Sequence, residues 1–293
     1  MHVEIVSHVW AGPRDQYAKA LCYQLSSLIL HPPTIDVTMT VFYTPEDSAT
    51  VAVLAFFEQL RSERRLSYFA DVERKPEQKT VFLPRVIYDK AKLRTAERQD
   101  DSPVTWNFRP LPKNSLLQRA IGRNMAAKQT KADVIWMADA DYLWCEGCLD
   151  SLTQLAGKLG PLWFPRETLL QVSHALGDAT LDAVTEPGIY AINEDCGDDE
   201  PAEFEPKIEK RAIGGIQIVA GDVARKVGYC DGTKWMTPVP EGTDYVAGFK
   251  SDVDFRWALG TDGEPIDVPN LFRLRHGVDG QGRVVPGAIP PAE

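Results

Sequence analysis

Asp139 and Asp141 follow directly on a run of apolar residues in the stretch VIWMADADYLW, residues 134–144. Two carboxylates at the end of a buried strand repel each other unless a cation lies between them. Oxygen ligands of this kind suit a hard divalent ion such as Mg²⁺ or Mn²⁺, which keeps coordination positions for phosphate oxygens. Such an ion neutralises a diphosphate leaving group as its bond breaks. The pair therefore indicates a metal site for a phosphate-containing ligand, although acidic residues also follow strands simply as turn formers or helix caps.

Two further pairs of charged residues could take part in chemistry. Arg119 and Arg123 are one helical turn apart, so they could hold a diphosphate together or form a solvent-exposed basic pair. Asp252 and Asp254, in SDVDFRWAL, could alternate along a strand, cap a helix, or supply a general base. The spacing alone leaves these alternatives open.

Strands and helices alternate ahead of the two aspartates. The patterns predict strands at 2–10 and 35–43, helices at 13–30, 44–63 and 113–133, and a strand at 134–137. Residues 81–88 read as another strand or an edge strand, because Pro84 cannot donate to a central ladder. This order predicts an α/β fold with a mostly parallel central sheet flanked by helices on both faces. In such sheets ligands bind beyond the carboxyl ends of the strands, where Asp139 and Asp141 are expected.

The composition is that of a globular protein. The 293 residues are 44% hydrophobic and 25% charged, which is enough for one large domain with a sizeable core. The start of the chain, MHVEIVSHVW, has neither a basic region nor a long apolar stretch, and no later segment approaches the length of a membrane span. We therefore expect a protein with no transmembrane segment and a cytoplasmic location.

The net charge of −10 is unevenly distributed. Residues 61–98 contain eleven Lys or Arg against six Asp or Glu, whereas residues 178–209 contain eleven acids and one Lys. The acidic segment lacks a regular apolar period and carries Gly and Pro, which predicts a solvated loop, either a surface insertion or a lid over the site. The five cysteines are too scattered for a disulfide framework, and CEGC at 145–148 has no second pair that would complete a zinc site.

The stretch GRNMAAKQTKADVIWMADADYLW resembles the core of family 2-type glycosyltransferases, which have the GT-A fold. In that family an Arg-Asn pair on a helix precedes an apolar strand that ends in a D-x-D motif. Arg123 and Asn124 match the pair, and Asp139 and Asp141 match the motif. Three later segments follow in the family's order, at residues 211–229, 251–259 and 271–277.

The resemblance implies a role for each matching residue. Asp141 would bind the metal directly, Asp139 would bind metal-bound water or the ribose and sugar of the donor, and His276 would be a third metal ligand. The general base would be Asp252, with Asp254 as the alternative because Ser251 replaces the glutamate that often precedes the base. The donor side would comprise Arg119, Arg123, Asn124 and Asp139, and the acceptor side Gly214, Gly215 and Trp235. His276 and Trp235 could instead be structural residues.

The function implied is transfer of a sugar from a nucleotide-sugar, such as a UDP- or GDP-sugar, to an acceptor hydroxyl, with Mn²⁺ or Mg²⁺ as cofactor and inversion at the anomeric carbon. A single domain, 1–293, would have a donor- and metal-binding half at 1–145 and an acceptor-side half at 146–293. The acceptor could be a saccharide, a lipid-linked sugar, a protein or a modified DNA base, the last as in phage enzymes of this type. The alternatives are a nucleotidyltransferase and a non-catalytic protein that binds nucleotide-sugars.

Overall fold

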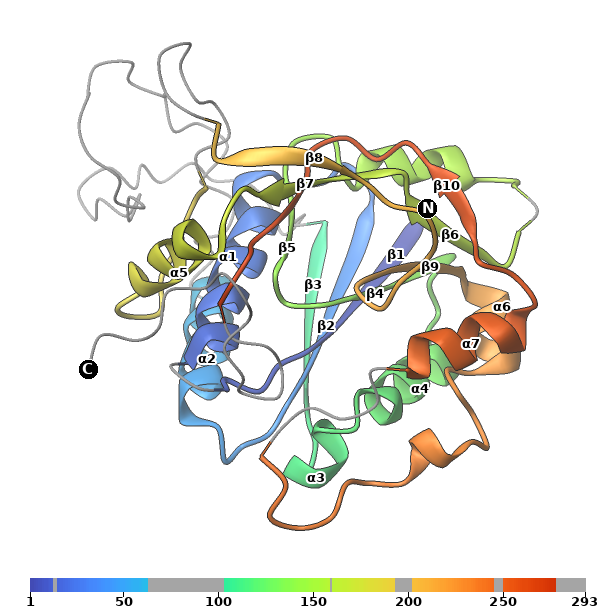
Figure 1. Cartoon of the computed structure of the whole chain (residues 1–293), viewed down its shortest axis with the longest axis horizontal. Coiled ribbons are helices and arrows are strands. Elements are labelled where there is room, and N and C mark those ends of the chain that lie inside the picture. Colours follow the sequence, from blue (N-terminus) through green and yellow to red (C-terminus); the bar gives the residue numbers. More distant parts are fainter. Residues whose placement is uncertain (13–14, 63–102, 159, 193–201, 245–249, 278–293) are drawn as a thin grey trace.

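The computed structural model describes residues 1–12, 15–62, 103–158, 160–192, 202–244 and 250–277. The strand predicted at 81–88, most of the basic segment 61–98, the middle of the acidic segment and the C-terminal tail lie outside the described residues. Figure 1 shows the helices and strands of the described part and draws the remainder as a grey trace.

Eleven strands form two sheets within the described residues. The strands are β1 (His2–His8), β2 (Asp36–Tyr43), β3 (Val104–Pro110), β4 (Val134–Ala138), β5 (Tyr142–Trp144), β6 (Leu162–Pro165), β7 (Glu167–Gln171), β8 (Phe204–Ile208), β9 (Ile216–Ala220), β10 (Glu264–Ile266) and β11 (Leu271–Arg273). The α-helices are α1 (Gln16–Leu30), α2 (Ser48–Ser62), α3 (Lys113–Leu116), α4 (Arg119–Gln129), α5 (His174–Asp182), α6 (Gly221–Val227) and α7 (Ser251–Leu259), and two short 3₁₀ helices are η3 (Asp150–Leu155) and η4 (Lys234–Met236).

The large sheet has seven strands in the order β10-β6-β9-β4-β1-β2-β3. All neighbouring pairs are parallel except those that β9 makes with β4 and β6, which are antiparallel. The predicted α/β fold with a mostly parallel, helix-flanked sheet is therefore confirmed. Strands from both predicted halves of the chain, 1–145 and 146–293, pair within this one sheet.

Helices cover the large sheet on both sides. In Figure 1, α1 and α2 lie on one side of the sheet, and α4, α6 and α7 lie on the other. Strand β4 is buried along its whole length, as are five of the seven residues of β1. A strand that is covered on both faces can be apolar at every position, which explains why β4 lacks the alternation of a half-exposed strand.

The small sheet has the order β5-β11-β7-β8 and corrects the prediction for the acidic segment. Residues 178–182 belong to α5 rather than to a loop, because the hydroxyl of Ser173 caps this helix by accepting a hydrogen bond from the backbone of Leu176 at 3.1 Å. Residues 204–208 form β8, which pairs with β7 at the edge of the sheet, where Pro206 is tolerated. The loop prediction for 178–209 was therefore wrong at both ends.

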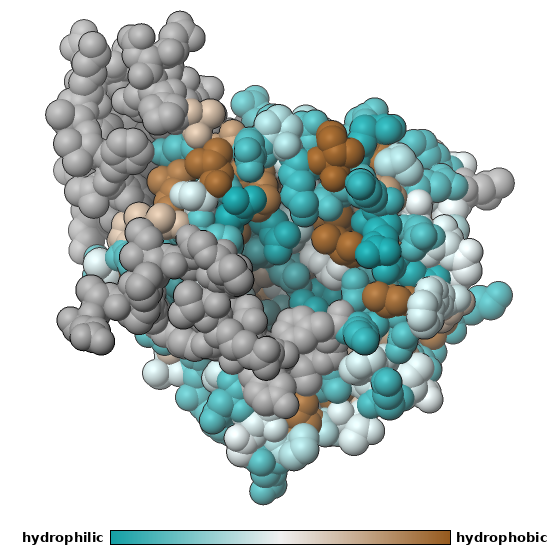
Figure 2. Space-filling view, viewed as in Figure 1, coloured by the Kyte–Doolittle hydropathy of each residue, from teal (hydrophilic) through white to brown (hydrophobic). Residues whose placement is uncertain are grey.

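The exterior of the described residues is mostly polar. The coloured residues on the face shown in Figure 2 are largely hydrophilic, and the hydrophobic ones stand in small separate groups. The large hydrophobic side chains that are exposed are Val51, Val172, Ile208 and Trp257. No helix in the described ranges is long and apolar enough to cross a membrane.

Candidate functional site

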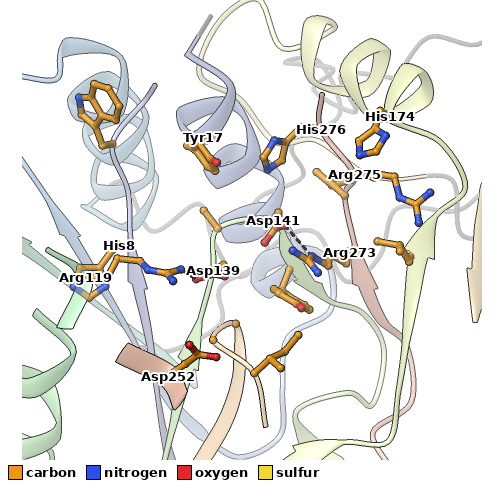
Figure 3. Close-up of a pocket in the computed structure, with 18 residues that line it drawn as sticks. His8, Tyr17, Arg119, Asp139, Asp141, His174, Asp252, Arg273, Arg275 and His276 are labelled. Carbon is orange, nitrogen blue, oxygen red and sulfur yellow. Dashed lines mark hydrogen bonds and ion pairs between the residues drawn. The ribbon is translucent and has the colours of Figure 1, made fainter. Parts of the chain in front are cut away.

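A cavity of about 480 Å³ opens at the carboxyl ends of β1 and β4, which is within the usual size of small-molecule sites. It lies where parallel-sheet proteins place their ligands. The predicted site residues that line it are Arg119, Asp139, Asp141, Gly214, Gly215, Asp252 and His276. The predicted residues outside its lining are Arg123, Asn124, Trp235 and Asp254. Figure 3 shows Arg119, Asp139 and Asp252 on one side of the cavity and His276, Arg273 and Arg275 on the other.

The turn that contains the two aspartates is held by α1. The side-chain amide of Gln24 donates to the backbone carbonyls of Asp139 and Tyr142 at 2.7 and 3.2 Å. The same side chain accepts a hydrogen bond from the hydroxyl of Ser7 on β1 at 2.9 Å. The turn is also tied to β11, because the backbone of Leu274 donates to the carbonyl of Asp141 at 2.9 Å. Segments from three parts of the chain therefore fix the backbone from which both carboxylates project.

Asp139 lies between two arginines of α4. Its Oδ1 accepts hydrogen bonds from Arg119 at 2.8 Å and from Arg123 at 2.9 Å. Burial alone would raise the pKa of Asp139, but Arg119, Arg123 and Arg273 together lower it to about 2. Arg123 is fully buried, and although burial acts to lower its pKa, Tyr229 and Asp139 raise it overall. On this side of the cavity, two positively charged arginines therefore bind and fix one negatively charged carboxylate.

Asp141 forms an ion pair with Arg273. The Nε atom of Arg273 donates to Oδ2 of Asp141 at 2.9 Å, and the guanidinium stacks over the ring of Tyr142 at 5.0 Å. Burial acts to lower the pKa of Arg273, but Asp141 and Tyr142 raise it overall, so the arginine stays charged. The other carboxylate oxygen of Asp141, Oδ1, is buried and has no hydrogen-bond partner among the described residues. A buried acceptor without a partner carries an energetic penalty unless a ligand or water satisfies it.

The donor set decides what kind of cation this site could hold. Within the described ranges, no three His, Cys, Asp or Glu side chains are grouped so that they could hold a metal by themselves. The predicted trio of Asp139, Asp141 and His276 is therefore not assembled as a protein-only cage. A Mg²⁺-like ion needs only one or two carboxylates when water and phosphate oxygens supply the other ligands, and Oδ1 of Asp141 is available for this. The residues fit a cation that binds together with a phosphate-containing ligand.

The structure distinguishes between the two candidates for the general base. Asp252 lies in the first turn of α7 and lines the cavity, and its Oδ1 is buried without a hydrogen-bond partner among the described residues. Asp254 lies outside the cavity lining and accepts a hydrogen bond from the indole nitrogen of Trp235 at 2.5 Å. Residues two apart on a helix point in nearly opposite directions, so only one of the two can face the cavity. Asp252 therefore faces the cavity and Asp254 does not.

Asn124 makes structural contacts away from the cavity. Its Oδ1 accepts a hydrogen bond from the backbone of Tyr229 at 2.9 Å, and its amide nitrogen donates to Asp231 at 3.2 Å. Gly228, at the end of α6, has a φ of +73°, and a Cβ there would lie 2.4 Å from Oδ1 of Asn124. Asn124 therefore holds the turn after α6 rather than lining the site.

His276 lies between α1 and α5. Its ring meets Tyr17 of α1 edge-on, with ring centroids 5.0 Å apart. The next residue, Gly277, donates from its backbone to Asp178 of α5 at 2.8 Å. Asp178 also accepts a hydrogen bond from Gln16 at 3.0 Å, so one carboxylate joins both helices to this segment.

Sequence reasoning missed several residues that line the cavity. They are His8, Trp10, Tyr17, His174, Arg273 and Arg275. His8 is the last residue of β1, and both ring nitrogens are buried without hydrogen-bond partners in the described part of the chain. Burial, then Arg123 and Arg119, lowers the pKa of His8 well below its ordinary value, so the ring is neutral. Its place at the carboxyl end of a parallel strand was a usable signal, because ligands bind at that edge.

Gly215 packs directly against Asp139. A Cβ at this position would lie 3.0 Å from Oδ2 of Asp139 and 2.5 Å from Cε2 of the buried Tyr142. The carbonyl of Gly215 accepts a hydrogen bond from the indole nitrogen of Trp136 at 3.3 Å, which ties it to β4. Glycine therefore allows the segment before β9 to approach the aspartate turn closely.

Comparison with known proteins gives only remote similarity. No protein-family model matches the chain, and no curated protein matches it. It is similar to a structure of S. aureus TarS 1-349, with 10% identity, a TM-score of 0.43, and 93% of this chain and 60% of that chain covered. It is also similar to the glycosyltransferase GlyE of Streptococcus pneumoniae TIGR4, with 9% identity, a TM-score of 0.38, and coverage of 90% and 44%. A second structure of TarS shows 10% identity and a TM-score of 0.42, with 93% of this chain and 36% of that chain covered.

The chain spans only 36% to 60% of the length of these three structures. With similarity this remote, the residues of the cavity carry the functional argument.

Proposed function

We propose that the chain is a glycosyltransferase that binds a nucleotide-sugar in this cavity and transfers the sugar to an acceptor hydroxyl. The observation that carries the proposal is the presence of two kinds of groups in the lining of one cavity. Asp139 and Asp141, with Arg119 and Arg273 bonded to them, make up a site for a diphosphate and a cation. Asp252 adds a carboxylate that lines the same cavity, and its buried Oδ1 has no hydrogen-bond partner in the described part of the chain.

The donor's diphosphate would be bound by the arginines and the cation together. Arg119 is fixed by Asp139, and Arg273 by Asp141, so both guanidinium groups are already oriented before a ligand arrives. Mn²⁺ or Mg²⁺, when bound, would offset the charge that develops on the leaving diphosphate. Asp141 would hold this ion through Oδ1, with Asp139 binding its water ligands or the sugar. His276, which lines the same cavity, would be a further ligand.

The transfer step requires one proton acceptor. Asp252 would take the proton from the acceptor hydroxyl while the oxygen forms its bond to the anomeric carbon of the donor. The bond between that carbon and the diphosphate oxygen breaks, and the electron pair leaves with the diphosphate. Attack from the side opposite the leaving group inverts the configuration, which a single base is sufficient to support. Gly214 and Gly215, which line the cavity, would border the acceptor, whereas Trp235 donates a hydrogen bond to Asp254 outside the lining.

A screen of nucleotide-sugars tests the proposal without knowledge of the acceptor. The purified chain is incubated with UDP-, GDP- and other nucleotide-sugars, with Mn²⁺, with Mg²⁺ or with a chelator, and release of the nucleoside diphosphate is measured. We expect slow hydrolysis of at least one donor that depends on the cation and is lost in Asp252→Asn. Binding of a donor with no hydrolysis or transfer would instead indicate a non-catalytic binding protein. Absence of both binding and hydrolysis would contradict the proposal.

A further inference from the structure

A chain of hydrogen bonds runs through the core from Asp139 to the helix that carries Asp252. Arg123 donates to Oδ1 of Asp139 at 2.9 Å and to the hydroxyl of Tyr229 at 3.1 Å. The hydroxyl of Tyr229 lies 3.1 Å from Oε1 of Gln217, to which it donates. The side-chain nitrogen of Gln217 donates to the backbone carbonyl of Asp252 at 3.3 Å. Three side chains thus connect the carboxylate of Asp139 to the backbone of Asp252.

The hydrogen bonds of this chain all run in one direction. Arginine can only donate, a tyrosine hydroxyl accepts and donates, and a glutamine accepts through its oxygen and donates through its nitrogen. Burial raises the pKa of Tyr229, against the opposing effect of Arg123, so the hydroxyl keeps its proton. Arg123, Tyr229 and Gln217 are all fully buried. A buried network of this kind constrains its members strongly, because each unpaired group would be penalised in the low-dielectric interior.

Tyr229 contacts α7 through its ring as well. The ring of Tyr229 packs against Phe255, with centroids 4.5 Å apart and an angle of 32° between the planes. The following residue, Cys230, lies with its sulfur 3.1 Å from the carbonyl of Ser251, the first residue of α7. The segment after α6 therefore holds both the start and the middle of the helix that carries Asp252.

We propose that Tyr229 and Gln217 are positioning residues that fix Asp252 relative to Asp139. The inference rests on the proposed function, in which Asp139 faces the donor and Asp252 takes the proton. Neither Tyr229 nor Gln217 lines the cavity, so each acts through another residue. The chain of hydrogen bonds joins elements that are distant in sequence: α4, the segment after α6, β9 and α7. A displacement of about 1 Å at a reacting group can reduce turnover about 100-fold, so this spacing matters for the rate.

The variant Tyr229→Phe tests the chain of hydrogen bonds by removing one oxygen atom from its middle. The phenylalanine keeps the packing against Phe255 but cannot bond to Arg123 or Gln217. Tyr190→Phe is a control outside the cavity lining, because Tyr190 is also buried and its hydroxyl donates to the backbone carbonyl of Glu186, at 2.7 Å.

The measurements are kcat and KM for hydrolysis of the donor found in the screen, and the dissociation constant of its nucleoside diphosphate with Mn²⁺. For Tyr229→Phe we expect kcat to fall about 10- to 100-fold while KM and nucleotide affinity change less than about 2-fold. The control should lose less thermal stability, because its hydroxyl makes one part-buried bond, and should keep its kcat.

A second variant, Gln217→Met, breaks the same chain at another link with a side chain of similar length. If the chain acts as a unit, the double variant should lose no more kcat than the worse single variant. Fully additive losses, or a Tyr229→Phe enzyme with the kcat of the Tyr190→Phe control, would overturn the inference while leaving the proposed function in place. A wild-type chain that neither binds nucleotide nor hydrolyses a donor would overturn both proposals.

Discussion

We expect Asp252→Asn to lose turnover while keeping its fold and its affinity for nucleotide. Asparagine has nearly the shape of aspartate but cannot accept the proton, and Asp252 makes no side-chain bond to Asp139, Asp141 or their arginines in the structure. Loss of a general base usually lowers kcat by about 10²- to 10⁴-fold. The amide has the size of the carboxylate and still places a polar atom at the buried Oδ1 position, which has no partner among the described residues. The melting temperature should therefore stay close to that of the wild type.

Asp254→Asn is the matched control two residues along the same helix. Its carboxylate accepts the hydrogen bond from Trp235, so a neutral amide should weaken that bond and lower stability by about 1 kcal/mol. In a protein of this size that corresponds to a fall in melting temperature of about 2–4 °C. The kcat of this variant should stay within a few-fold of the wild type.

Donor hydrolysis, nucleotide titration and thermal unfolding on both variants separate the two roles. If Asp254→Asn is the inactive enzyme and Asp252→Asn the active one, then the reasoning from cavity lining is refuted. If both variants keep full turnover, the base lies elsewhere, or the enzyme retains configuration.

Three further results are expected. Asp141→Asn should abolish the tighter binding of Mn²⁺ in the presence of UDP or GDP, measured by calorimetry, and equal cooperativity in the wild type and the variant would contradict the shared cation site. The pKa of Asp139 is lowered from 3.8 to about 2, so its ion pairs stabilise the fold fully above about pH 4 and lose this contribution as the pH falls toward 2. Because the side chain is 30% exposed, the effect should be at most about 2 kcal/mol, and Asp139→Asn should flatten the acid limb of a plot of unfolding free energy against pH. Gly215→Ala should lower stability by about 1–3 kcal/mol because its Cβ would overlap Tyr142, whereas Gly214→Ala, with its nearest atom at 3.6 Å, should unfold at nearly the wild-type temperature.

The features that were predictable from sequence are local ones. The uniformly apolar residues of β4 and the alternation of strands and helices predict a covered parallel sheet, and the rule for such sheets places Asp139 at its carboxyl edge. The helical period places Arg119 and Arg123 on one face of α4, although their common partner in the structure, Asp139, was not predicted. These inferences need only the spacing of residues along one segment.

The features that were missed depend on contacts between distant segments. Arg273 lies 132 residues from Asp141, and no local pattern relates the two. The choice between Asp252 and Asp254 required the position of Trp235, which bonds to one of them and leaves the other facing the cavity. The acidic segment was predicted to be a loop because it lacks a regular apolar period and carries Gly and Pro, whereas a serine cap and pairing with β7 give it regular structure at both ends.

The reversed direction of β9 has a consequence for how this protein could be changed. Because β9 is antiparallel to β4, Ile216 at its start pairs with Ala138 at the end of β4. The residues just before β9 therefore lie at the cavity, whereas the residues just before each parallel strand lie at the opposite edge of the sheet. Ile213 and Gly214 line the cavity and can be exchanged without shifting the register of any strand, since the ladder begins only at Ile216. Gly215 has to stay glycine because it packs against Asp139 and Tyr142. Libraries confined to Ile213 and Gly214 would vary one wall of the cavity while the arginine and aspartate framework stays constant, which makes these two positions the natural starting point for engineering new selectivity.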